Sequence, residues 1–165
     1  MSVLMERHPV VRILKRRCLV GINEETVVEE MSIEDCWRLL ARARLGRLAV
    51  AVRDDIDIFP VNFVVSDGSL MFRTAPGSKL LELSVNPRVA FEADEYDDTF
   101  AASVVVKGDA ERVETQSDID AADALPLTPW IPTLKYRWVR ISPRSVTGRR
   151  FPRAPEPDRY SIIDE

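Results

Sequence analysis

The chain has 165 residues, of which 45% are hydrophobic and 30% charged, and its formal net charge at pH 7 is -4. This is about the length of one domain and the composition of an ordinary globular protein, so we expect a folded core. The acidic balance argues against nonspecific nucleic-acid binding, which usually shows as a basic face. No uncharged run approaches the ~20 residues needed to span a bilayer, so neither nucleic acid nor a membrane is predicted as a partner.

Few residue types are present for acid-base or metal chemistry. His8 is the only histidine, which by count excludes a catalytic histidine pair or a His-rich metal site. Cys18 and Cys36 match no C-x-x-C pattern, so we expect two separate thiols. Charges such as Glu6 and Arg7 interrupt the apolar run that a signal peptide needs, and we therefore expect a cytoplasmic protein.

Charge and proline content divide the chain into three parts. The first 23 residues are rich in basic side chains, and residues 24–35 carry six acids and no base. Such a switch predicts an N-terminal extension over residues 1–30 that either lies on the domain or on a partner subunit, or forms a partly ordered arm. One domain is expected over residues 31–150, and the Pro-containing residues 151–165 are predicted to form a C-terminal tail.

Local signals predict three helices. Ser32 and Asp35 resemble a capping box, and the apolar spacing after them predicts a helix that ends at Leu45-Gly46. A second helix is expected over residues 77–85, before Asn86-Pro87. A third is expected over residues 117–125, capped by Ser117.

Alternation and turn residues predict six strands, over residues 47–52, 56–65, 70–74, 88–93, 101–113 and 136–146. Pro60 indicates a sheet edge or a bulge, because it has no amide hydrogen to donate. Asp67-Gly68 is typical of a hairpin turn, and Gly108 is expected at a bulge or bend. Six short strands with few helices predict a mainly β protein, a small antiparallel barrel whose ends the helices cover.

The octapeptide Phe72 to Lys79 is the clearest candidate binding motif. Arg73 and Lys79 supply cations, and Thr74 and Ser78 supply hydroxyl groups. A phosphate monoester carries nearly two negative charges and favours charge-assisted donors, to which a helix beginning after Gly77 would add main-chain amides. The motif lacks the G-x-x-x-x-G-K pattern of a P-loop, and solvated cations beside a helix cap remain the alternative interpretation.

The order of several motifs along the chain resembles the pyridoxamine 5'-phosphate oxidase-like family of flavin-binding proteins. The matching stretches extend from about Ser32 to Arg150 and are, in order, PVNF from Pro60, Asp67-Gly68, FRT from Phe72, GSK from Gly77, NPRVAF from Asn86 and SVVVKGDA from Ser103. The resemblance implies a six-stranded antiparallel split barrel that assembles as a homodimer, with two FMN sites between the subunits.

By the same resemblance, eight residues are candidates for cofactor binding. Arg73, Thr74, Ser78 and Lys79 would face the FMN phosphate and ribityl chain. Four further residues would run beside the isoalloxazine ring or present main chain to its edge: Pro60, Val61, Asn62 and Phe72. Arg47, or a basic residue between Lys135 and Arg150 of the partner, would stabilise the reduced ring.

The resemblance implies a flavin-dependent oxidoreductase acting on a small molecule, with no catalytic side chain identified. A deazaflavin is the alternative cofactor. Many relatives have Trp just before the Ser that opens the fifth strand, where this chain has Ala102. This difference gives weight to two alternatives, a flavin-binding or sensing module without turnover and a barrel with no cofactor. Trp130, Ile131 and Trp138 are apolar candidates for the dimer interface.

Overall fold

The computed structural model describes residues 28–128, 130, 132 and 134–154, and for residues 78–81 the main chain alone. Seven strands in these ranges form one antiparallel sheet in the order β1-β7-β4-β3-β2-β5-β6, and a further pairing of β6 with β7 closes six of them into a ring. Their bounds are β1 Glu29–Glu30, β2 Leu45–Val52, β3 Asp55–Ser66, β4 Ser69–Thr74, β5 Arg88–Tyr96, β6 Phe100–Arg112 and β7 Arg137–Pro152. The predicted mainly β, six-stranded split barrel is confirmed.

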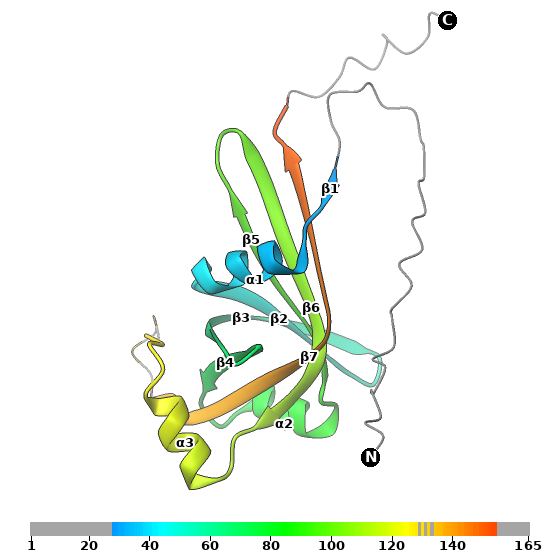
Figure 1. The fold of residues 1–165 in the computed structure, drawn as a ribbon. Coiled ribbons are helices and arrows are strands. Elements are labelled where there is room, and N and C mark those ends of the chain that lie inside the picture. Colours follow the sequence, from blue (N-terminus) through cyan, green and yellow to red (C-terminus); the bar gives the residue numbers. More distant parts are fainter. Residues whose placement is uncertain (1–27, 129, 131, 133, 155–165) are drawn as a thin grey trace, which may run out of the picture.

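The split in the barrel lies along β7, the longest strand. One edge of β7 pairs with β6 from Val139 to Pro152. The other edge pairs with β4 only as far as Ile141 and with β1 only from Arg149 onward. The short strand β1 therefore pairs with the C-terminal end of β7, which β4 does not reach. In Figure 1 the end of β7 that pairs with β4 and the end that pairs with β1 point in different directions.

Two helices cover the barrel ends and a third lies outside (Figure 1). Helix α1, Ile33–Arg42, buries Cys36, Leu39 and Leu40 among the inward side chains of the strands. Helix α2, Ser78–Val85, contributes Leu83 to the same core. Helix α3, Gln116–Asp123, packs through Ala122 on a second cluster formed by outward side chains, namely Val64, Met71, Val113 and Trp138.

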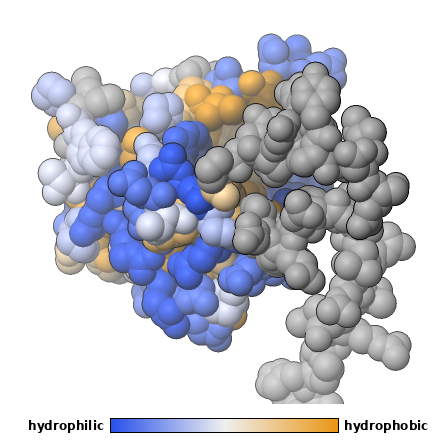
Figure 2. Space-filling view, turned by 90° about the horizontal axis from the view of Figure 1, so that it is seen from above, coloured by the Kyte–Doolittle hydropathy of each residue, from blue (hydrophilic) through white to orange (hydrophobic). Residues whose placement is uncertain are grey.

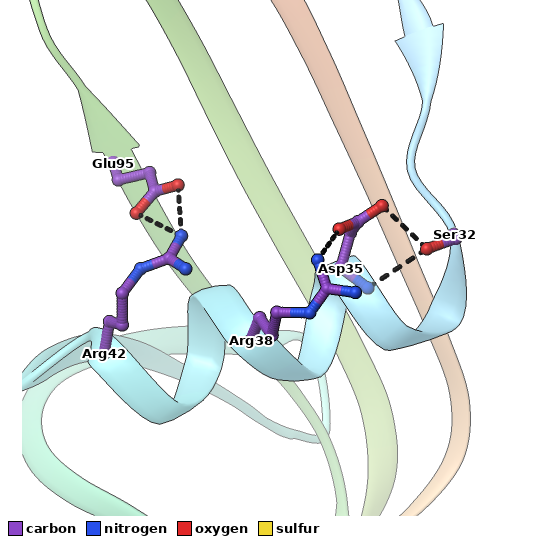
Figure 3. A network of polar contacts seen from close by, with 5 residues as sticks. All are labelled: Ser32, Asp35, Arg38, Arg42 and Glu95. Atoms are coloured by element: carbon purple, nitrogen blue, oxygen red, sulfur yellow. Dashed lines mark hydrogen bonds and ion pairs between the residues drawn. The ribbon is translucent and has the colours of Figure 1, made fainter.

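The capping box at the start of α1 is confirmed. The Ser32 hydroxyl oxygen accepts the Asp35 amide hydrogen at 3.1 Å, and its own hydrogen goes to the Asp35 carboxylate at 2.7 Å (Figure 3). Toward the other end of the helix, Arg42 forms a two-oxygen ion pair with Glu95 of β5, at 2.8 and 3.0 Å. Local and long-range contacts together fix how α1 lies on the barrel.

Turn chemistry is also as expected. Asp67 and Gly68 have φ angles of 48° and 69°, the positive values of a tight two-residue hairpin. The β6–β7 register shifts between Lys107 and Gly108, which is the predicted irregularity. Pro60 lies in a regular part of β3, and β4 pairs only with Phe63 to Ser66, so Pro60 stands where one edge of β3 is unpaired within the protomer.

Several predicted boundaries are wrong. The first helix ends at Arg42 because Leu45 already pairs with Asn62 in β2. The third helix begins at Gln116 after Thr115, earlier than a Ser117 cap requires. The last strand continues to Pro152, since β6 offers pairing partners along its whole length.

Most of the predicted extension and tail falls outside the described residues. In the extension, only Glu29–Glu30 is seen in a strand, and residues 151–154 are what the structure shows of the tail. In the described part of the chain, no helix is both long and apolar enough to cross a membrane. Seen from above, the described surface is a mosaic of hydrophilic areas with smaller hydrophobic areas near its edge (Figure 2).

Candidate functional site

A row of side chains crosses the outer face of β3, β4 and β7. Along β4, Leu70 and Phe72 point into the barrel core, so the alternation of a strand turns Arg73 outward. Arg73 pairs with Trp138 of β7, and its guanidinium carbon lies 5.4 Å from the centre of that indole ring. On the other side, the β3–β4 ladder ends at the Phe63–Phe72 pair, and Asn62 and Arg73 are the next residues of the two strands at this end of the ladder.

Arg73 carries an unpartnered polar atom. Its Nε is the one buried side-chain nitrogen or oxygen of the described residues that has no hydrogen-bond partner. A buried donor without an acceptor costs about 1–3 kcal/mol, more when charged. An anionic ligand placed beside Arg73 would supply the missing acceptor, so the site fits a phosphate group on the chemistry of its donors.

Thr74 and the start of α2 follow Arg73 along the chain. Thr74 is 5% exposed and its hydroxyl donates to the Ala75 carbonyl at 3.2 Å, so a ligand would meet that oxygen as an acceptor unless the hydroxyl turns. Gly77 precedes α2 without any side-chain cap, which leaves first-turn amides of α2 for other acceptors. Ser78 and Lys79 begin that helix, and their side chains lie outside the described part.

The side chain of Asn62 forms hydrogen bonds through both its amide nitrogen and its amide oxygen. Its Nδ2 donates to the Arg44 carbonyl at 3.0 Å, and its Oδ1 accepts the main-chain amide of Trp130 at 3.1 Å. The residue thus ties two other segments to β3. Its predicted place beside a ring stays a prediction, but its amide group is occupied by main chain.

The three remaining candidates differ in what they can present. Pro60 is exposed on the outer face of β3. Val61 is 4% exposed and Phe72 is fully buried, both in the barrel core, so only their main chain is available to a ligand outside the barrel. Contact between any of these residues and a cofactor stays a prediction.

Arg47 is already neutralised. It donates to Glu92 at 2.8 Å and also to Asp94, both on the neighbouring strand β5. The hydrogen bonds to Asp94 and then Glu92 raise the pKa of the guanidinium. Arg140 and Arg144 in the other predicted cation source, the segment from Lys135 to Arg150, also have acidic partners, Glu111 at 3.6 Å and Asp109 at 3.1 Å, so the pairing favours neither source.

Two residues of the site have no signal in the sequence that reveals their role. Trp138, expected at a dimer interface, is 2% exposed and lies inside the protomer, so that interpretation is wrong. The apolar character of Trp130 does not predict its bond to Asn62. Neither contact is local, because 68 residues separate Asn62 from Trp130 and Arg73 meets Trp138 only through strand register.

An apolar area lies on the outer face of β3, where that strand has its unpaired edge. Ile56 and Ile58 are 71% and 65% exposed. Their neighbours in register on β2 are Ala51 and Ala49, and Ala49 in turn pairs with Ala90 of β5. We call Ile56, Ile58, Ala49, Ala51 and Ala90 the small apolar face; its exposed isoleucine side chains suit it for contact with another protein surface.

The described residues contain no group of three or more His, Cys, Asp or Glu side chains placed to hold a metal ion. The carboxylates of β5 are instead used in ion pairs with Arg42 and Arg47.

Comparison with known proteins identifies the family. The sequence profile described as pyridoxamine 5'-phosphate oxidase matches residues 32–150. The chain belongs to the pyridoxamine 5'-phosphate oxidase-like family. An uncharacterised protein of Mycobacterium tuberculosis is 41% identical over 96 residues, which are 58% of this chain and 87% of that protein.

Solved structures agree with this family assignment. A Corynebacterium glutamicum protein named after pyridoxamine 5'-phosphate oxidase is 46% identical, with a TM-score of 0.72 over 77% of this chain and 100% of that chain. A FAD-binding protein from Mycobacterium smegmatis is 40% identical, with a TM-score of 0.67 over 75% of this chain and 98% of that chain. A FAD-binding protein from Mesorhizobium loti is 27% identical, with a TM-score of 0.64 over 76% and 98%.

Proposed function

We propose that this protein is a homodimeric flavin-dependent oxidoreductase that holds its cofactor by the flavin 5'-phosphate, beside Arg73 and the start of α2. The observation that carries the proposal is the buried Nε of Arg73, which lacks an acceptor in the described structure. The flavin is FMN or FAD, since both contain that phosphate and two similar solved proteins are FAD-binding by name.

The residues of the octapeptide divide the binding work. Arg73 is held against Trp138, so its guanidinium is oriented before a ligand arrives. The uncapped first turn of α2 adds amide donors and the positive end of its dipole to the same phosphate. Ser78 and Lys79 open that turn, and we propose a hydroxyl and a point charge from them.

The ring of the flavin would lie along the outer face of β3 at Pro60 and Val61, with Asn62, whose amide group binds main chain, at the end of this stretch. Pro60 presents an exposed apolar surface, and the carbonyl and amide groups on the unpaired edge of β3 are available to a ring edge. When bound, the flavin supplies hydride and electron transfer between a small-molecule substrate and a second acceptor or donor. The protein would position the flavin, exclude water from it and place charged groups near it.

The second subunit would cover the small apolar face. Ile56 and Ile58 expose large apolar side chains, which is typical of a surface that another protein covers. Both lie close to Pro60 along β3. A partner packed on this face would also close the proposed ring site from outside. Arg47, or a cation from the partner segment between Lys135 and Arg150, would then compensate the reduced ring. A cytoplasmic location stays a prediction.

The first test is the colour of the purified protein. We expect a yellow protein that releases FMN or FAD on denaturation, identified by mass spectrometry, and whose visible absorbance bleaches with NADH or NADPH. Release of a deazaflavin would replace the cofactor assignment. A flavin that dithionite bleaches but neither NADH nor NADPH does would favour a carrier or sensor. A chain that stays colourless with added flavins would show that the barrel binds none.

The second test addresses the phosphate. Each charged hydrogen bond contributes about 1.5–3 kcal/mol, so Arg73→Ala should weaken FMN binding by about ten- to a hundredfold. Arg112→Ala is the matched control, because Arg112 is an exposed arginine at the end of β6. Equal FMN affinity in the Arg73→Ala and wild-type proteins would show that the phosphate binds elsewhere.

A further inference from the structure

The segment between α3 and β7 is fixed to the proposed ring strand at one point. The main-chain amide of Trp130 donates to Asn62 Oδ1 at 3.1 Å, while Asn62 Nδ2 donates to the Arg44 carbonyl at 3.0 Å. The amide nitrogen and the amide oxygen of Asn62 each form a hydrogen bond with main chain, which defines the orientation of the side chain. Trp130 therefore stands beside Asn62 as a consequence of the fold.

The same segment is fixed at both of its ends. Trp138 Nε1 donates to Asp123 at the end of α3, at 2.7 Å. Leu125 and Leu127 pack on the cluster that contains Trp138, and β7 begins at Arg137. Leu125 and Leu127 before Trp130 and Trp138 after it are therefore anchored to the barrel, and Trp130 itself is anchored to Asn62.

Packing of the indole in a core does not explain the position of Trp130, because its side chain is exposed. Trp130 is 63% exposed, although tryptophan is usually well buried in a folded protein. Its main-chain amide binds Asn62, and Asn62 and Arg73 lie at the same end of the β3–β4 ladder, where the Nε of Arg73 has no acceptor. An exposed aromatic side chain in the segment before β7 and an unpartnered donor of a cation on β4 are complementary to a ligand that has a flat conjugated ring and an anionic group.

We propose that Trp130 is a specificity-determining residue of the ligand site, whose indole forms an aromatic wall against the ring of the bound molecule. This inference rests on the proposed flavin function and adds a residue to it. Asn62 is then a positioning residue, which acts on the ligand through Trp130. The wall selects flat conjugated rings over other phosphate esters, because stacking rewards a planar π-face and gives little to a sugar phosphate.

The test separates the ring from the phosphate by using two probes, FMN and riboflavin, which share the ring and differ in the phosphate. Aromatic pairs contribute about 0.5–1.5 kcal/mol beyond area burial, which is about two- to tenfold in affinity. We expect Trp130→Leu to weaken both probes by the same two- to tenfold factor, and Trp130→Phe to restore most of the loss. Leu134→Ala is the control, since Leu134 is an exposed residue of the same segment at 78%.

Asn62 supplies the second arm. Asn62→Leu should reduce riboflavin affinity by the same factor as Trp130→Leu, and the double variant should lose no more than either single one, because both act through one contact. Asn62→Asp keeps the acceptor for the Trp130 amide and should retain more affinity than Asn62→Leu. Circular dichroism of every variant, compared with wild type, checks that the barrel is folded.

Failure of this inference can be told from failure of the proposed function. If Arg73→Ala weakens FMN and not riboflavin, while Trp130→Leu changes neither, the flavin function stands and the aromatic wall is wrong. An equal loss in Leu134→Ala and Trp130→Leu would also overturn the wall, since the effect would belong to the whole segment. If the wild-type protein binds neither probe and does not bind FAD either, both the function and the wall are wrong.

Discussion

Cys36 of α1 lies directly against Gly148 of β7, so close that a Cβ atom at residue 148 would stand 2.6 Å from the Cys36 sulfur. The same Cβ would be 3.0 Å from the sulfur of Met31. Helix α1 thus approaches β7 at a point where only glycine leaves enough room. The packing of α1 over this end of the barrel therefore requires a residue without a side chain at position 148.

Gly148→Ala should lower the free energy of unfolding by about 1–3 kcal/mol, because overpacking forces α1 away from the strand. Chemical denaturation followed by circular dichroism measures the change. Ser145→Ala, an exposed position of the same strand, is the control and should stay within about 0.5 kcal/mol of wild type. Similar stability of Gly148→Ala and wild type would mean that α1 shifts freely on β7.

Burial of the Cys36 thiol predicts low reactivity. Cys36 is 1% exposed, and burial first, then the charge of Asp35, raises the pKa of its thiol. Since the thiolate is the reactive form, modification should require opening of α1. In a Cys18→Ser variant, labelling of Cys36 by a thiol reagent should follow the unfolding curve in denaturant. Complete labelling within minutes under native conditions would contradict the packing described for α1.

The helix cap at Ser32 predicts a pH effect. The Ser32 hydroxyl first, and Arg38 among others, lower the pKa of the Asp35 carboxyl from its ordinary 3.8. A carboxyl whose pKa is lower when folded stabilises the fold above its ordinary pKa, and this contribution is lost as the pH falls through the lowered value. Ser32→Ala should raise the Asp35 pKa in an NMR titration and cost about 1 kcal/mol of stability through the lost cap.

A second carboxyl serves as the internal control for that titration. The pKa of Asp97 is also lowered, first by the Thr99 hydroxyl and then by the Thr99 amide, in the turn between β5 and β6. Ser32→Ala should leave the titration of Asp97 unchanged. A parallel shift of both carboxyls would indicate a change in the whole fold and not the loss of one hydrogen bond.

These relationships show which features a sequence can predict. Ser32 with Asp35, and Asp67 with Gly68, act within a few residues, so the side-chain chemistry itself specifies the cap and the turn. The alternation of apolar and polar residues predicts the strands, and the number of strands predicts a barrel. The octapeptide at Phe72 to Lys79 is likewise a local signal, and it lies at the end of β4 and the start of α2.

The remaining features depend on contacts between distant residues. The local spacing of Leu45 fits a helix end, but pairing with Asn62 draws the residue into β2. The stack of Arg73 on Trp138 requires the β4–β7 register, which no local pattern specifies. The apolarity of Trp138 alone suggests a dimer interface, whereas α3 covers the residue within the protomer.

The bond between Trp138 and Asp123 gives a test of how α3 is held. Asp123→Ala would leave the buried indole nitrogen of Trp138 without its acceptor, which costs about 1–3 kcal/mol of stability. Asp123→Asn keeps an acceptor oxygen and should recover much of that loss. Thermal or chemical denaturation of the two variants decides the point, and equal stability of Asp123→Ala and wild type would show that packing alone holds α3.

The small apolar face predicts what disrupts the proposed dimer. Ile58 is 65% exposed at the unpaired edge of β3, opposite Ala49 of β2. A charge there would be desolvated in any interface, so Ile58→Asp should convert a dimer to a monomer in light scattering while leaving the melting of the barrel nearly unchanged. Ser145→Asp, an exposed site on β7, is the control. If the flavin site is completed by the partner, the monomeric variant should also lose bound flavin, and a monomer that keeps full affinity would show that one protomer forms the whole site.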